Sequence, residues 1–293
     1  MSTAEALQHY RTLTNKVFSK SNRKRSGTFK ATTLEVAMKQ VIKAALEGYS
    51  GEEYMIKGTE TSRLDKRWVS ESFHLYRKNV NFCCSVVCAL PMLNTRFPRL
   101  FRSYPNPINS SAGEDCAIWQ AARATMASPN LFKPVKIQML GGIVEEFVDA
   151  GYKCNNPSVI IIGEAADVFG VNRSVGLFLS IGAGHPGTIK LTKADRFQQE
   201  LLKALTAISE DCEHIVDELK KRFSDIHHIY MRFNVSHGLD LDNLEEGQIV
   251  THVKTYLAEI AVSHQVDQVV ESLVREVSHR FPVTLGTMSK SMV

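Results

Sequence analysis

Segments with the pattern of β-strands alternate with segments with the pattern of amphipathic helices along most of this 293-residue chain. Residues 79–93 and 229–235 alternate between apolar and polar side chains, and residues 175–181 form an apolar run, as in a buried strand. Helix-like segments separate these strands, including two over residues 193–223. This order predicts an α/β protein with helices layered on both sides of a mostly parallel sheet.

Local signals mark the starts of several elements. Ser2 and Glu5 have the spacing of a capping box, which predicts an N-terminal helix. Thr33 is a candidate cap for a second helix. Residues 145–149 have the pattern of a strand, and Asn155-Asn156-Pro157 predicts a helix start, because proline is tolerated in the first helical turn.

The length of the chain fits one main domain, which we expect over residues 1–280. A polar insertion rich in Gly, Ser and Glu is expected at about residues 48–65, and a C-terminal tail at residues 281–293. A chain of this length can bury a full hydrophobic core without disulfides or metal ions.

The longest apolar stretches are too short to cross a membrane, and the first twenty residues carry charges and no apolar run. Neither a transmembrane helix nor a secretory signal is therefore predicted. Six cysteines without a C-x-x-C pair indicate reduced thiols and a cytoplasmic protein. A zinc site on Cys84 and Cys88 is one alternative, but buried cysteines that pack as small apolar side chains are favoured, and no metal is expected.

Positive charge is concentrated near the N-terminus. Residues 1–30 contain seven Lys or Arg and one acidic residue, a local charge of +6, whereas the whole chain carries +4. The basic residues at 20–25 are candidates for contact with phosphates of lipid or nucleic acid, or for a nuclear signal. A solvated linker between two helices is the favoured interpretation, and because no aromatic residues are interleaved, no nucleic-acid partner is expected.

Ligands of α/β folds bind at the carboxyl ends of strands, which directs attention to residues 91–92, 149–151 and 182–187. The last of these, GAGHPG, matches the dinucleotide pattern G-x-G-x-x-G. A nucleotide site also needs a helix directly after the glycines, and the sequence TIKL that follows does not predict one. A glycine turn that leaves a buried strand is favoured, and His185 alone is a weak indication of chemistry.

Asp149 is the strongest candidate for a chemical role. It ends a predicted strand and precedes the turn formed by Ala150 and Gly151. A partly desolvated carboxylate in this position can accept a proton from a nucleophile, but an aspartate at such a junction can equally form an Asx-turn. No nucleophile accompanies it, because G-x-S-x-G is absent from the sequence and Ser180 lies inside an apolar strand, which predicts its burial.

Several short motifs follow one another in a fairly specific order. They are FRSYP at 101–105, IWQAARATMASP at 118–129 with FKP at 132–134, FVDAG at 147–151, CNNP at 154–157, LSIGAG at 179–184 and YMRFNV at 230–235. This order resembles the fungal branch of the patatin-like phospholipases. The likeness covers about residues 4–273.

The resemblance implies a patatin-like fold and hydrolysis of acyl esters by a Ser–Asp dyad, without a cofactor. Asp149 would accept the serine proton, with Ala150 and Gly151 as its motif loop and Asn155-Asn156-Pro157 as a supporting loop, while a glycine-rich loop would hold the oxyanion. The implied substrates are acyl esters of lipids. Peripheral contact of this cytoplasmic protein with membranes is part of the same expectation.

The chain departs from the family pattern at two points. The glycine-rich oxyanion loop and the G-x-S-x-G elbow of the family lie upstream of the point where this sequence begins. We therefore expect a patatin-like domain that is incomplete on its N-terminal side and inactive alone. The family also has glycine where this chain has Ala150, which costs about 1–2 kcal/mol if φ is positive there. The alternative function is a non-catalytic interaction module, or the remnant of an enzyme.

Overall fold

The computed structural model describes residues 2–26, 28–45, 50–52, 55, 84–104, 106, 108, 116–139, 142–184, 188–189, 197–224, 226, 229–235, 246–274 and 283–289. The chain divides into two compact units, Met1–Cys154 and Asn155–Val293, each with its own buried core. Most of the insertion predicted at residues 48–65 lies outside the described residues.

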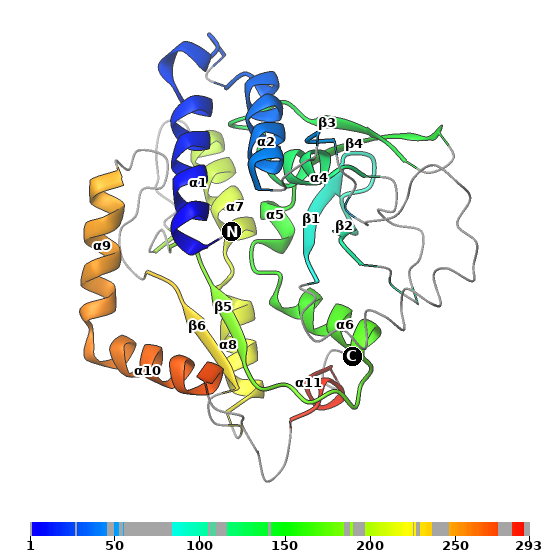
Figure 1. The fold of residues 1–293 in the computed structure, drawn as a ribbon. Coiled ribbons are helices and arrows are strands. Elements are labelled where there is room, and N and C mark those ends of the chain that lie inside the picture. Colours follow the sequence, from blue (N-terminus) through cyan, green and yellow to red (C-terminus); the bar gives the residue numbers. More distant parts are fainter. Residues whose placement is uncertain are drawn as a thin grey trace. The chain divides into compact units, whose positions relative to one another are not determined.

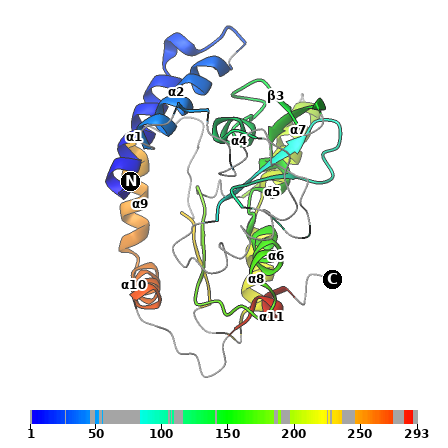
Figure 2. The ribbon, with the colours of Figure 1, turned by 45° about the vertical axis from the view of Figure 1, so that its right-hand side comes forward.

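Two helices, α1 (Thr3–Val17) and α2 (Ala31–Ala45), lie side by side in the N-terminal unit (Figures 1 and 2). The predicted capping box is confirmed at the start of α1. The Glu5 N–H donates to Ser2 Oγ at 3.3 Å, and the Ser2 N–H donates to the Glu5 carboxylate at 2.6 Å. These two bonds satisfy donors that a helix N-terminus otherwise leaves free.

The basic segment at residues 20–25 connects the two helices, as its favoured interpretation predicted, and Lys20, Arg23, Lys24 and Arg25 are exposed. It begins with a 3-10 turn, η1 (Lys20–Asn22), and Arg23 then forms a β-bridge with Phe29. The prediction that Thr33 caps α2 is wrong, because the helix begins at Ala31. The Thr33 hydroxyl donates to the Asn22 side chain instead, at 3.2 Å.

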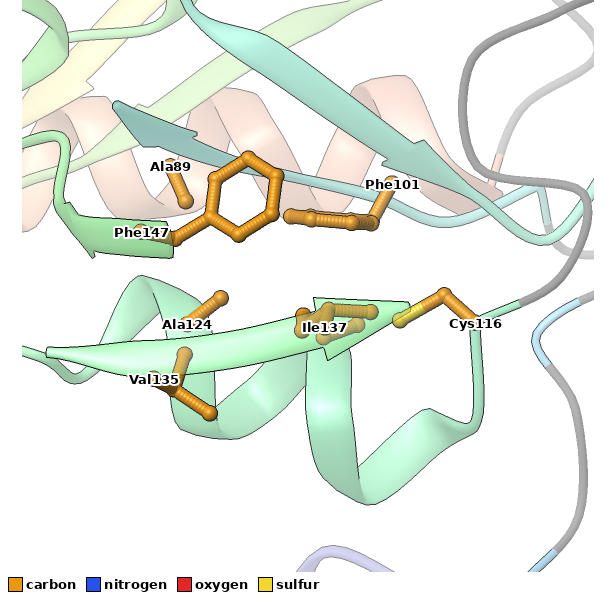
Figure 3. Close-up of a cluster of buried hydrophobic side chains, with 8 residues drawn as sticks. Ala89, Phe101, Cys116, Ala124, Val135, Ile137 and Phe147 are labelled. Carbon is orange, nitrogen blue, oxygen red and sulfur yellow. The ribbon is translucent and has the colours of Figure 1, made fainter. Parts of the chain in front are cut away.

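A four-stranded antiparallel sheet makes up much of the described remainder of the N-terminal unit, in the order β2-β1-β4-β3. Its strands are β1 (Val86–Pro91), β2 (Arg99–Arg102), β3 (Val135–Gln138) and β4 (Val144–Asp149). Helix α4 (Ile118–Thr125) packs against β1, β3 and β4. In the core between them, the rings of Phe101 and Phe147 meet edge to face with centroids 5.3 Å apart (Figure 3).

The C-terminal unit contains a two-stranded parallel sheet, β5 (Phe178–Ile181) with β6 (Tyr230–Phe233), in which Ser180 lies opposite Arg232. Helices precede, connect and follow these strands. They are α6 (Ser158–Phe169), α7 (Phe197–Glu210), α8 (Glu213–Arg222), α9 (Glu246–Ala258), α10 (Ile260–Val274) and α11 (Leu285–Ser289).

The core of the C-terminal unit joins helices that are distant in sequence. Ile162 of α6, Leu219 of α8 and Met288 of α11 are all buried in one cluster. Residues 283–289, which the sequence assigned to a tail, therefore contribute Val283, Leu285 and Met288 to buried positions. Helix α10 runs across the end of α9 in both views (Figures 1 and 2).

The prediction of an α/β protein is confirmed, but the described strands do not form one mostly parallel sheet. In the larger sheet, residues 92–98 join β1 to β2 and residues 139–143 join β3 to β4, and both connections are too short for the crossover of about a dozen residues that parallel strands need. The central pair β1–β4 is also antiparallel, whereas β5 and β6, which are separated by residues 182–229, are parallel. In the described part of the chain, no helix is both long and apolar enough to cross a membrane.

Candidate functional site

Asp149 is held at the end of β4 by its neighbours on three sides. It lies opposite Ala89 of β1, and its N–H donates to the carbonyl of Ala127 at 3.1 Å. One carboxylate oxygen, Oδ1, accepts the N–H of Gly151 at 3.0 Å. This bond from residue i+2 is an Asx-turn, so the structural alternative for Asp149 is confirmed, and a chemical role has to be compatible with the turn.

The Asp149 carboxyl is half-buried. Burial raises its pKa above the ordinary aspartate value, and the N–H groups of Gly151 and Ala150 oppose this rise. Within the described residues, no lysine or arginine forms an ion pair with it. A carboxylate with a raised pKa and no paired cation can act as a proton acceptor.

Ala150 follows Asp149 and precedes a short helical turn, α5 (Gly151–Cys154). Ala150 is buried, and its carbonyl accepts the N–H groups of Lys153 and Cys154 at 2.9 and 2.7 Å. Gly151 does not adopt a left-handed backbone, but a Cβ added there would lie 3.1 Å from Asp149 Oδ2. The close approach of the carboxylate, and not the backbone conformation, favours glycine at this position.

Asn155, Asn156 and Pro157 belong to the C-terminal unit, where they start α6 as predicted. Asn156 is buried, and its Oδ1 accepts the N–H of Ser158 at 3.2 Å and the Ser158 hydroxyl at 2.6 Å. Asn155 is exposed and donates to the carbonyl of Glu210 at 2.5 Å. These contacts support a helix start. Ser180 is buried beside Ser158, and the two hydroxyl oxygens are 3.4 Å apart.

The glycine turn after β5 contacts the end of β6. The Gly182 N–H donates to the carbonyl of Phe233 at 2.8 Å, and the Gly184 N–H donates to Asn234 Oδ1 at 2.9 Å. His185 and the rest of the predicted nucleotide motif lie outside the described residues, and residues 188–189 are not helical. The described part of this segment therefore agrees with a glycine turn.

Cys84 and Cys88, the alternative zinc ligands, are both only half-buried, and among the described residues no group of three potential metal ligands comes together.

A second polar site lies in the C-terminal unit, and the sequence analysis did not single it out. Arg232 of β6 donates from Nη1 to Ser180 Oγ at 2.8 Å and from Nη2 to Cys212 Sγ at 3.3 Å. Asn234 follows the same strand; its Nδ2 donates to Glu213 Oε1, and its N–H donates to the Tyr256 hydroxyl, both at 3.2 Å. The available signal was the alternation of Tyr230, Arg232 and Asn234, since a parallel strand is usually apolar on both faces.

A comparison of the chain with protein-family models, curated proteins and solved structures finds no match. The basis for a functional proposal is therefore the geometry of Asp149 and its turn, together with the order of motifs in the sequence.

Proposed function

We propose that the chain is a patatin-like lipid acyl hydrolase domain in which Asp149 is the proton acceptor of a Ser–Asp dyad. The observation that supports this most directly is the half-buried Asp149 carboxylate at a strand end, fixed by the Gly151 N–H and unpaired with any described lysine or arginine. The proposal includes a layered patatin-like sheet, of which the parallel β5–β6 pair would be a part. Lipid acyl esters as substrates would bring this cytoplasmic protein into peripheral contact with membranes.

The local structure around the other motifs is compatible with this proposal. The segment LSIGAG forms the end of β5 and a glycine turn, and Asn155-Asn156-Pro157 starts α6. In the proposed reaction, Asp149 takes the serine proton as the serine oxygen attacks the ester carbonyl. The proton then passes to the leaving alcohol, and water releases the acyl group as a carboxylic acid. The serine belongs to a G-x-S-x-G elbow, a motif that does not occur within these 293 residues.

A serine-reactive fluorophosphonate probe tests whether this chain carries a nucleophile of its own. We expect no covalent labelling of the purified 293-residue chain, because positioning and oxyanion stabilisation need the elbow and its glycine-rich loop. Labelling of any serine in this chain would show that it carries its own nucleophile and would contradict the proposed dyad.

Complementation with a second polypeptide tests whether Asp149 is the base of the dyad. A polypeptide carrying a patatin-type oxyanion loop and G-x-S-x-G elbow is added to the chain, and hydrolysis of p-nitrophenyl butyrate is measured. We expect turnover with the wild-type chain, none with Asp149→Asn, and wild-type turnover with Asp217→Asn, which changes an exposed carboxylate of α8. Equal turnover with Asp149→Asn would exclude Asp149 as the base.

The second candidate is a non-catalytic interaction module, and the Asx-turn favours it, because Asp149 Oδ1 already has a structural partner in the Gly151 N–H. This candidate predicts no ester turnover in any of these mixtures. It also predicts that Asp149→Asn leaves the fold intact, since an amide oxygen can accept the same N–H.

A further inference from the structure

A cavity of about 550 Å³ opens in the C-terminal unit along β6. This volume is within the range of small-molecule sites. Four elements line it: strand β6 with the residue that follows it, and the helices α8, α9 and α10. The polar side chains on its wall are Glu213, Lys220, Tyr230, Arg232, Asn234, Tyr256, Gln265 and Gln268.

Arg232 brings an uncompensated positive charge to this wall. The acceptors of its two hydrogen bonds, Ser180 Oγ and Cys212 Sγ, are neutral groups, since burial raises the pKa of the Cys212 thiol even though the charge of Arg232 opposes the rise. Arg232 Nε is buried without a hydrogen bond, and no carboxylate among the described residues forms an ion pair with the guanidinium. A guanidinium has five N–H donors and these two bonds use one on Nη1 and one on Nη2, so the half-buried Arg232 side chain keeps terminal donors for an anion.

Donors on the helices face the same cavity. Lys220 of α8 supplies a second cation, and Gln265 and Gln268 of α10 supply amide groups. Tyr256 of α9 uses its hydroxyl oxygen to accept the Asn234 N–H, which leaves the hydroxyl proton available to a ligand.

The cavity also has one acceptor with a full charge. Glu213 is its single described carboxylate, against the two cations Lys220 and Arg232, so the wall carries a net charge of +1. Glu213 Oε1 already accepts from Asn234, and Oε2 is the oxygen left for a hydroxyl of a ligand. The net positive charge attracts an anion, and Glu213 can also accept a hydrogen bond from a hydroxyl group of the same ligand.

From this arrangement we infer that the cavity binds a small polyol phosphate, with the phosphate on Arg232 and Lys220 and the hydroxyl groups on Glu213 and Tyr256. A planar guanidinium binds phosphate through paired hydrogen bonds, and a lysine adds charge. The same chemistry occurs in a free polyol phosphate and in a phospholipid headgroup. The site is independent of Asp149 and of the proposed ester hydrolysis.

Isothermal titration calorimetry of the full chain at low ionic strength tests this inference. The probes are glycerol 3-phosphate, inorganic phosphate, glycerol, and dihexanoylphosphatidylglycerol below its micellar concentration. We expect glycerol 3-phosphate to bind more tightly than phosphate, and glycerol not to bind. Saturable binding of the short-chain phospholipid, more tightly than of glycerol 3-phosphate, would assign the site to a lipid headgroup; the reverse order would assign it to a free polyol phosphate.

Variants locate the binding. Lys220→Gln should weaken glycerol 3-phosphate binding severalfold, and Lys221→Gln, the exposed neighbour on the same helix, should leave it unchanged. Arg232→Gln should weaken it by about tenfold or more, the loss expected for a charged hydrogen bond. Arg232→Lys keeps the positive charge but not the paired donors of the guanidinium. Its affinity for glycerol 3-phosphate should therefore lie between those of wild type and Arg232→Gln.

Circular dichroism shows whether each variant is folded. If Arg232→Gln is not folded, the glycerol 3-phosphate binding of Lys220→Gln and of Gln265→Leu, which changes an exposed residue of α10, decides the outcome. The inference is wrong if no phosphate-bearing probe binds, or if the Lys220 and Lys221 variants bind equally.

Discussion

The fully buried guanidinium of Arg123 on helix α4 lies 3.5 Å from the carboxylate of Glu35 on helix α2. The same guanidinium donates to the carbonyl of Lys133 just before β3, and it stacks over the Phe132 ring at 5.6 Å from the centroid. Burial lowers the pKa of Arg123, and the charge of Glu35 opposes this. One ion pair thus joins the helical pair α1–α2 to the sheet of the N-terminal unit.

Glu35→Gln should lower the free energy of unfolding of the chain by about 1–3 kcal/mol, because it leaves a buried charge without its counter-ion. Urea denaturation followed by circular dichroism measures the change. Lys203→Gln is the control, since it removes a solvent-exposed pair with Glu200 on α7 and should change stability by about 1 kcal/mol or less. Equal losses for both variants would show that Arg123 does not depend on Glu35.

Asp149→Asn should stabilise the chain at neutral pH. Burial raises the folded-state pKa of Asp149 above its unfolded value, so between these two pKa values the folded state binds more protons than the unfolded state. Stability associated with this group is therefore present at low pH and lost as the pH rises through the folded pKa. The amide avoids that loss and keeps the acceptor for the Gly151 N–H.

Thermal denaturation from pH 3 to pH 8 checks this prediction. The difference between wild type and Asp149→Asn should be largest at neutral pH and vanish below about pH 4, the ordinary aspartate range. Asp217→Asn, at an exposed position of α8, should show no such trend. A wild-type chain more stable than Asp149→Asn at pH 7 would mean that a partner stabilises the ionised carboxylate.

Gly182→Ala should destabilise the C-terminal unit. A Cβ at this position would overlap the Asn234 side chain and lie 2.8 Å from Arg232 Nη2, so both side chains would have to move. Overpacking of this kind costs about 1–3 kcal/mol. Gly176, on the other side of β5, has no atom within 4 Å of an added Cβ, and Gly176→Ala should be neutral or slightly stabilising.

Melting temperatures of the two glycine variants give the comparison. Calorimetry with glycerol 3-phosphate adds a second measurement, because displacement of Arg232 in Gly182→Ala should also weaken the proposed binding. Equal melting temperatures for Gly182→Ala and Gly176→Ala would show that the turn adjusts its conformation without displacing Asn234 and Arg232.

The positions of strands and helices could be predicted from the sequence, because apolar periodicity and capping residues act locally. Ser2 and Glu5 form the predicted capping box, and Asn155-Asn156-Pro157 starts a helix where expected. The pairing direction of the strands was mispredicted. The connection from Pro91 to Arg99 is too short for a parallel crossover, and this constraint outweighs the general tendency of alternating strands and helices.

The candidate sites likewise differ in whether local sequence predicts them. The Asx-turn of Asp149 could be predicted because it depends on residues two positions apart. The cluster of Ser180, Cys212 and Arg232 could not, since it depends on the register of β5 with β6 and on where α8 begins. This register brings together residues that are far apart in the sequence, so it is not visible in the local spacing of side chains.

Asn234 uses three polar groups for three different segments: its N–H for Tyr256 of α9, its Oδ1 for the turn at Gly184, and its Nδ2 for Glu213 of α8. Aspartate would keep the acceptor and place a second negative charge beside Glu213, while serine and alanine would be too short to span the gap. The main-chain N–H is kept by any residue except proline, so replacement of the amide would release helix α8 and the Gly184 turn together, which leaves the position little freedom to drift during evolution.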